Sequence, residues 1–164
     1  MKTSAVGINL IKHFEGYRSE AYPDPGSSDG YPWTIGYGHT EGVHKGDKIT
    51  EGTAELFLIS DLASVEKAIN ELVLAPISLS EFDALSSFVY NLGSANFKSS
   101  TLLKKINAWD MLGAADEFPR WIYNNGNIMG GLVKRRNAER SIFLGMALEK
   151  AIADGEAAYA LGWS

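Results

Sequence analysis

The sequence has no cysteine among its 164 residues, which excludes a disulfide framework, a cysteine nucleophile and cysteine metal ligands. It also lacks an apolar run of about 18 residues, so no membrane-spanning helix and no membrane insertion are predicted. The formal net charge of −5 argues against a nucleic-acid partner, because nucleic-acid binders usually carry a basic stripe. No glycine-rich phosphate-binding signature stands between a predicted strand and a predicted helix. We therefore expect neither a nucleotide cofactor nor bound nucleic acid.

The remaining composition is that of an ordinary soluble globular protein, with 45% hydrophobic and 21% charged residues. This length suits one domain, or two lobes that share a connecting element. The first sixteen residues contain only a short apolar patch, without the apolar core or cleavage site of a signal peptide. We interpret them as a helix of the mature protein, and the protein as made in the cytoplasm.

The order of predicted elements is a helix, a small sheet, a long helix and a group of helices. Ser4 can cap a first helix that Gly16 ends. Residues 17–49 are rich in Gly, Pro, Ser, Asp and Tyr, and alternate as two strands around the loop "PDPGSSDGYP". "GDKIT" closes this β region. Thr50 caps a helix that runs to about residue 73 on one apolar stripe.

The remainder is predicted to be helical, with a turn at "NNGN". Ser80 is expected to start one helix, and residues 99–109 and 110–118 are expected to form two more. A strongly helical pattern covers residues 130–150, and a last helix is expected over 151–160. The fold class is therefore α+β and mainly α. A single domain is expected, with a small lobe at about 15–57, a connecting helix at about 51–73 and a helical lobe at about 74–164 that includes the N-terminal helix.

Three polar residues flank the two predicted strands. Glu15 and Asp24 lie nine positions apart on either side of the first strand, and Thr34 begins the apolar part of the second. Glycosidic cleavage requires two carboxyl groups in unlike environments, one protonated and one ionised. A threonine hydroxyl can hold the attacking water by a hydrogen bond. The spacing alone is weak evidence for an active site, since such pairs of acids are common.

The motifs together are more specific, and they resemble the phage-type lysozymes, glycoside hydrolase family 24, over about residues 5–146. The pieces that carry the resemblance are, in order, "FEG", "AYPD", "TIGYGHT", "GDKIT", "FDAL", "NLG", "STLL", Trp121 and "GLVKRRNAERSIF". The resemblance implies a lysozyme-like two-lobed fold with a small antiparallel sheet. It also implies a muramidase that cleaves the β-1,4 bond between N-acetylmuramic acid and N-acetylglucosamine in peptidoglycan, without a metal or other cofactor.

The family's catalytic motif implies that Glu15 is the general acid, and that Asp24 with Thr34 positions and activates water on the opposite sugar face. This inverting arrangement predicts carboxyl groups about 6.5–9.5 Å apart. The sequence departs from the motif in one place. Nine residues separate Asp24 from Thr34, where the family has five. Asp29 is therefore an alternative second acid, although the "AYPD" context and the distance from Glu15 favour Asp24.

The resemblance also assigns supporting roles. His39 is implied to be a structural partner beside the cleft. An arginine of the late helix is implied to pair with Glu15, and Arg135 matches this position better than Arg136. By residue type, Tyr37 and Trp121 are candidates for contact with sugar rings, and Asn124 and Asn125 in the predicted turn are candidates for contact with acetamido or hydroxyl groups. No pair of histidines has the spacing of metal ligands, so no metal site is predicted.

Two other functions remain open at this point. A lytic transglycosylase would cut the same bond with the substrate's own hydroxyl and would need no water-activating pair. An inactive lysozyme-like domain would bind the wall without cutting it. The expected partner is the peptidoglycan glycan strand in each case. Family habit further implies a monomer that acts on the cell wall after holin-dependent release.

Overall fold

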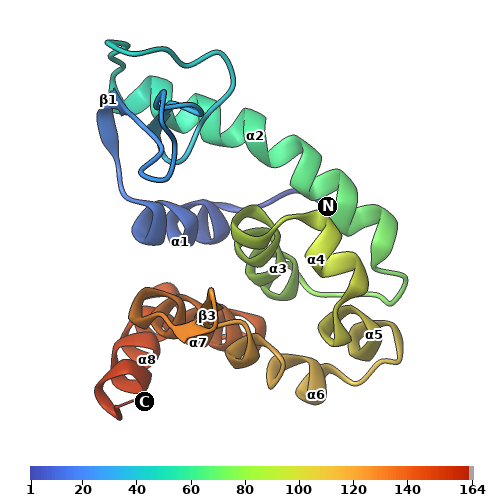
Figure 1. Cartoon of the computed structure of the whole chain (residues 1–164). Helices are drawn as coiled ribbons and strands as arrows, with labels where there is room; N and C mark the ends of the chain where they lie inside the picture. The colour runs from blue at the N-terminus through green and yellow to red at the C-terminus, as the bar shows by residue number, and fades with distance from the viewer. Residues whose placement is uncertain (163–164) are drawn as a thin grey trace.

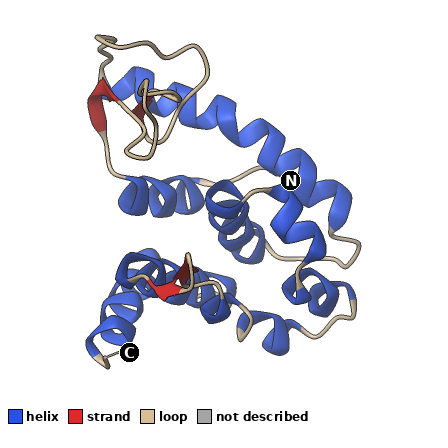
Figure 2. Cartoon of the chain, viewed as in Figure 1, coloured by secondary structure: helices blue, strands red, loops and turns tan. Residues whose placement is uncertain are grey.

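The elements are taken from a computed structural model that describes residues 1–162. In chain order they are α1 (Ala5–Glu15), β1 (Arg18–Tyr22), β2 (Thr34–Gly36), α2 (Glu51–Leu72), α3 (Leu79–Leu92), α4 (Ser94–Ser99), α5 (Thr101–Asn107), α6 (Met111–Ala115), the 3₁₀ turn η1 (Phe118–Arg120), β3 (Tyr123–Asn124), β4 (Asn127–Ile128), α7 (Gly130–Phe143) and α8 (Leu148–Ala160). Figure 2 shows that helices dominate and that the strands are short. The predicted fold class is confirmed.

The long helix α2 connects the small β region to the larger group of helices (Figure 1). The Thr50 hydroxyl accepts a hydrogen bond from the Thr53 N–H at 3.2 Å, which satisfies one of the free donors at the helix start. The stripe predicted from the sequence is buried at Leu58, Leu62 and Ile69. The expectation of a long helix at this place is therefore confirmed.

The small β region consists of two antiparallel strands and a third segment. β1 pairs with β2, with Tyr22 opposite Thr34. The ladder is irregular further along β1, where Glu20 forms a bridge with Lys48 in the predicted "GDKIT" segment. The hairpin thereby returns Thr34 to the end of the strand that leads into Asp24.

Two hydrophobic clusters stabilise the fold, and α1 contributes to both. Leu10 is part of the large cluster among the C-terminal helices, whereas Ile11 packs with Leu58 and Leu62 in the small one. Neighbouring positions on one helix thus face different cores. The end of α1, where Glu15 lies, is consequently held between the two parts of the molecule.

The start of α3 differs from the prediction. Ser78, and not Ser80, caps this helix, because its hydroxyl accepts from the Glu81 N–H while the Glu81 carboxylate accepts from the Ser78 N–H. This reciprocal pair is a capping box, which fixes the helix start two residues earlier. Ser4 does occupy the N-cap position of α1, but its hydroxyl donates to Asp83 at 2.5 Å and makes no cap bond.

The C-terminal region is also divided differently from the prediction. The continuous helix expected over 130–150 ends at Phe143, and Gly145 takes a positive φ of 91° before α8 begins at Leu148. Glycine adopts this conformation without the steric cost that other residues meet. α8 then folds back against α7, so closely that a Cβ on Gly155 would lie 2.3 Å from the Lys134 carbonyl oxygen.

Two short features were absent from the prediction. The helix α4 precedes α5, which begins at Thr101, and the "NNGN" turn joins β3 and β4 as a hairpin. Asn125 and Gly126 have φ of 51° and 79°, as a tight two-residue hairpin turn requires. Within residues 1–162, none of the helices combines the length and the apolar character needed to cross a membrane.

Candidate active site

Glu15 is the last residue of α1, and its side chain faces a cleft of about 510 Å³. The residues that line this cleft are Phe14, Glu15, Asn91, Leu92, Tyr123, Asn124, Met129, Gly131, Leu132 and Arg135. The Glu15 side chain is 22% exposed. The carboxyl group is therefore largely enclosed by protein, yet a ligand in the cleft can reach it.

Arg135 of α7 is the cation beside Glu15, as the resemblance implied. Its Nη1 lies 2.5 Å from Glu15 Oε2, and its side chain is only 5% exposed. The same guanidinium donates through Nη2 to the Ser87 carbonyl oxygen at 3.2 Å. Its Nε lies 3.3 Å from both the Ser87 hydroxyl and Glu139 Oε2. A charged group fixed at this many points holds a defined orientation toward Glu15.

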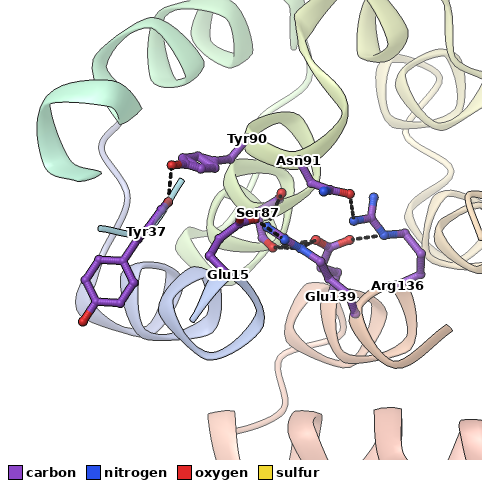
Figure 3. Close-up of polar contacts among 8 residues, drawn as sticks. Glu15, Tyr37, Ser87, Tyr90, Asn91, Arg136 and Glu139 are labelled. Carbon is purple, nitrogen blue, oxygen red and sulfur yellow. Dashed lines mark hydrogen bonds and ion pairs between the residues drawn. The ribbon is translucent and has the colours of Figure 1, made fainter. Parts of the chain in front are cut away.

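The other carboxylate oxygen of Glu15 faces the end of β2. Gly38 has a φ of 92°, and a Cβ at this position would lie 3.2 Å from both Glu15 Oε1 and the Tyr90 hydroxyl. That hydroxyl donates to the Tyr37 carbonyl oxygen at 2.6 Å (Figure 3). Burial raises the pKa of Tyr90 far above its usual value, so the hydroxyl remains a donor at physiological pH. A second hollow of about 630 Å³ is lined in part by Gly38 and Tyr90.

Asp24 and Thr34 lie at the opposite end of the β1–β2 hairpin from Glu15. Tyr22 pairs with Thr34 in the ladder, and Asp24 follows Tyr22 by two residues. Both side chains are partly buried. The Thr34 hydroxyl has only a 3.4 Å contact with the Pro32 carbonyl oxygen. This weak contact leaves the hydroxyl available to a further partner.

The long segment between Asp24 and Thr34 forms a closed loop. The Asp24 N–H donates to the Gly30 carbonyl oxygen at 3.0 Å, and the Ser27 N–H donates to the Asp24 carbonyl oxygen at 3.1 Å. Asp29 is exposed, and its carboxylate accepts from the Tyr31 N–H and the Ser27 hydroxyl within this loop. Asp29 therefore has a local structural role, which favours Asp24 as the second acid.

His39 connects the hairpin to α2. Its Nδ1 lies 2.8 Å from Asp61 Oδ2, and its ring stacks on Phe57 at a centroid distance of 4.3 Å. Both partners belong to α2. These contacts hold the His39 side chain against α2.

The predicted sugar contacts have different surroundings. Tyr37 is 4% exposed, its ring packs in the small core, and its hydroxyl donates to Glu51 at 3.1 Å. The ring therefore has no free face, and we withdraw it as a sugar contact. Trp121 is partly buried, and its ring lies edge-to-face with Phe88 at the large core. Asn125 is exposed at the hairpin turn, and its neighbour Asn124 lines the cleft in its place.

Two polar cleft residues, Tyr123 and Asn91, were not predicted from the sequence. Tyr123 lines the cleft from the β3–β4 hairpin, beside the predicted Asn124, and Asn91 lines it from α3. Asn91 Oδ1 accepts a hydrogen bond from Arg136 Nη2 at 2.5 Å, which turns the amide nitrogen away from Arg136. Burial is the main cause that lowers the pKa of Arg136, to about 10, so this donor stays charged at neutral pH. Asn91 belongs to the "NLG" motif and Asn124 to the "NNGN" turn. The sequence does not indicate that these two segments line the same cleft.

Comparison with known proteins identifies the family. The family model "Phage lysozyme" matches residues 12–139. The endolysin of Acyrthosiphon pisum secondary endosymbiont phage 1 is 40% identical over 147 residues, which cover 87% of this chain and 98% of the relative. The endolysin of Bacillus phage B103 is 44% identical, but this chain spans only 54% of its length.

Solved structures agree with the sequence relatives. The muramidase domain of SpmX from Asticcacaulis excentricus has a TM-score of 0.82 at 36% identity, covering 88% of this chain and 99% of that chain. A P22 lysozyme mutant has a TM-score of 0.79 at 36% identity, with the same two coverages. The resemblance that the motifs indicated is therefore confirmed. The chain belongs to the phage lysozyme family, and it is a peptidoglycan-hydrolysing muramidase.

Proposed function

We propose that Glu15 is the general acid that protonates the leaving oxygen of the β-1,4 bond between N-acetylmuramic acid and N-acetylglucosamine. The single observation that carries this proposal is its position, since Glu15 is the carboxyl group that lines the cleft and contacts Arg135. A general acid must be within hydrogen-bonding reach of the atom that it protonates. A sugar chain bound in the cleft would meet that requirement.

Asp24 and Thr34 hold and activate the attacking water in this proposal. The register of the hairpin supports this pairing, since Thr34 lies opposite Tyr22 and Asp24 follows Tyr22 by two residues. Asp24 accepts a proton from water, and the Thr34 hydroxyl orients that water by a hydrogen bond. Attack from the face opposite Glu15 inverts the anomeric centre. The bond from the sugar to the leaving oxygen breaks as the bond from the water oxygen forms.

The cleft walls offer groups that suit an acetylated glycan. The exposed ring of Tyr123 can stack against a sugar face, and the amides of Asn91 and Asn124 can hydrogen-bond acetamido and hydroxyl groups. Trp121 supports this wall from the core side and is proposed to act through packing. Asn125 contributes by shaping the turn that presents Asn124.

A lysis assay tests the general acid. Glu15→Gln should abolish the clearing of permeabilised Gram-negative cells, because the amide keeps the shape of the side chain but carries no transferable proton. Glu20→Gln is a matched control, because Glu20 is exposed on β1 and does not line the cleft. We expect the control to clear cells at the parent rate. Equal clearing by the parent and Glu15→Gln would refute the assignment.

The wider setting of the enzyme is also proposed. The family acts on the cell wall, and we propose that this chain works there as a monomer after holin-dependent release. Size-exclusion chromatography with light scattering tests the monomer. Expression with and without a holin tests the release route, with lysis expected only when the holin is present.

A further inference from the structure

Helix α7 carries one acidic residue, Glu139, which has no part in the proposed mechanism. Glu139 is fully buried, at 0% exposure, one helical turn beyond Arg135. Its Oε2 accepts a 2.5 Å hydrogen bond from the Ser87 hydroxyl and lies 3.3 Å from Arg135 Nε. Figure 3 shows Glu139, Ser87 and Glu15 close together beside Arg136. A buried acid of this kind needs charged or hydrogen-bonding partners.

Glu139 links two arginines that have different tasks. Arg135 reaches Glu15, and Arg136 reaches Asn91 at the cleft wall. Arg136 Nε lies 3.1 Å from Glu139 Oε1, an ion pair without the alignment of a hydrogen bond. Two cleft residues, Glu15 and Asn91, are thus each held by an arginine. Both arginines adjoin the buried carboxylate of Glu139.

The charges of this cluster explain why an acid at this position matters. Arg135 and Arg136 carry two positive charges, which Glu15 and Glu139 balance when both are ionised. Protonation of Glu15, which a general acid requires, removes one negative charge beside a nearly buried arginine. Glu139 remains as an anionic partner of Arg135 in that state. Without Glu139, Glu15 would be the one carboxylate left beside Arg135 in the described cluster, and the buried cation would favour the ionised form of Glu15.

We propose that Glu139, together with the Ser87 hydroxyl, is a positioning residue for the general acid. It fixes the Arg135 guanidinium and shares its charge, so that Glu15 can carry the proton at the pH of catalysis. This inference rests on the proposed role of Glu15. Among the described residues, the ionisable groups around the site include Tyr22 of β1, Asp61 of α2, Tyr90 of α3, Tyr123 of β3, and Arg135, Arg136 and Glu139 of α7.

The test compares initial rates on purified peptidoglycan as a function of pH. Glu139→Gln keeps the shape of the side chain and removes its charge. We expect the alkaline limb of the pH profile to move to lower pH by about one unit, because Arg135 then favours the Glu15 carboxylate. Ser87→Ala changes none of the ionisable groups of the cluster, so we expect the alkaline limb of the pH profile to stay in place. We expect kcat to fall by about tenfold, because the Arg135 guanidinium loses part of its fixed orientation.

Ser141→Ala is the matched control, because it also replaces a buried serine by alanine. Ser141 lies on α7, and its hydroxyl donates to Asp154 of α8 and not to Glu139. We expect the rate and the pH profile of this control to equal those of the parent per folded molecule. If Glu139→Gln does not fold, the comparison of Ser87→Ala with Ser141→Ala decides the proposal. Ser87 and Glu139 variants that behave as this control would overturn it.

The outcome of Glu15→Gln separates this inference from the proposed function. If Glu15→Gln is inactive while Ser87→Ala and Glu139→Gln match the control, only the positioning role is wrong. If Glu15→Gln retains the parent rate, the general acid itself has been misassigned, and the positioning role is lost with it.

Discussion

The Asp24 backbone N–H donates a 3.0 Å hydrogen bond to the Gly30 carbonyl oxygen. This bond closes the loop formed by the residues between them. This closed loop can hold the four residues by which the spacing exceeds the family motif. Its tip is exposed, and such sites tolerate insertions and deletions well. The proposed geometry of Asp24 and Thr34 can therefore survive a longer loop.

Deletion of residues 26–29 should leave a folded and active enzyme. The deletion restores five residues between Asp24 and Thr34, and we expect activity within about threefold of the parent because the loop tip is dispensable. Cell-clearing rates and thermal unfolding of the purified variant measure both properties. A folded but inactive deletion variant would show that the loop supplies an essential group.

Replacement of the two rival acids should have unequal effects. Asp24→Asn removes the proposed base, and we expect the rate to fall by about a hundredfold or more. Asp29→Asn retains an oxygen that can accept from the Tyr31 N–H, so its activity should equal that of the parent. Initial rates on purified peptidoglycan distinguish the two. The reverse result would assign the second acid to Asp29.

Gly30 should not tolerate a side chain. Its φ of 85° disfavours other residues, and a Cβ would lie 2.6 Å from the Trp33 ring. We expect Gly30→Ala to lower the free energy of unfolding by about 2 kcal/mol through backbone strain and steric conflict. Gly26→Ala is the control, because its nearest contact would be Asp24 Oδ2 at 3.8 Å. Chemical denaturation of both variants tests this, and equal stabilities would contradict it.

The sequence was sufficient to predict the general fold. The long α2 helix followed from one apolar stripe and the Thr50 cap, and the β region followed from alternation and turn residues. These are local signals, because each is read within one element. The start of α3 was missed because Ser78 and Ser80 are both reasonable caps, and only the reciprocal bond with Glu81 distinguishes them.

The site was less completely predictable, for a physical reason. The pairing of Glu15 with Arg135 came from the family resemblance, since 120 positions separate the two residues. The burial of Tyr37 depends on α2 packing over β2, which alternation in a short strand does not reveal. Glu139 carried no signal at all, because a charged residue on a helix is normally expected to face solvent.

Asp154 of α8 should stabilise the enzyme in a pH-dependent way. Hydrogen bonds from Lys150 and then from Ser141 lower its pKa below the usual value. Its contribution is therefore present above the pKa of the unfolded chain, about 3.9, and is lost as pH falls through the lower folded value. Since the side chain is partly exposed, we expect Asp154→Asn to cost no more than about 1 kcal/mol at pH 7.

Denaturation of Asp154→Asn and the parent at several pH values measures this effect. The difference between their unfolding free energies should shrink toward zero in strong acid, where both side chains are neutral. A difference that is independent of pH would show that the interaction is not electrostatic.

Product analysis of digested peptidoglycan tests the proposed roles of Glu15 and Asp24 most directly. Hydrolysis through Glu15, Asp24 and water predicts fragments that end in reducing N-acetylmuramic acid, with the anomer at the new end initially inverted. Glu15→Gln should yield no fragments under the same conditions. Fragments that end in 1,6-anhydro-N-acetylmuramic acid would contradict the account, because they form without an attacking water.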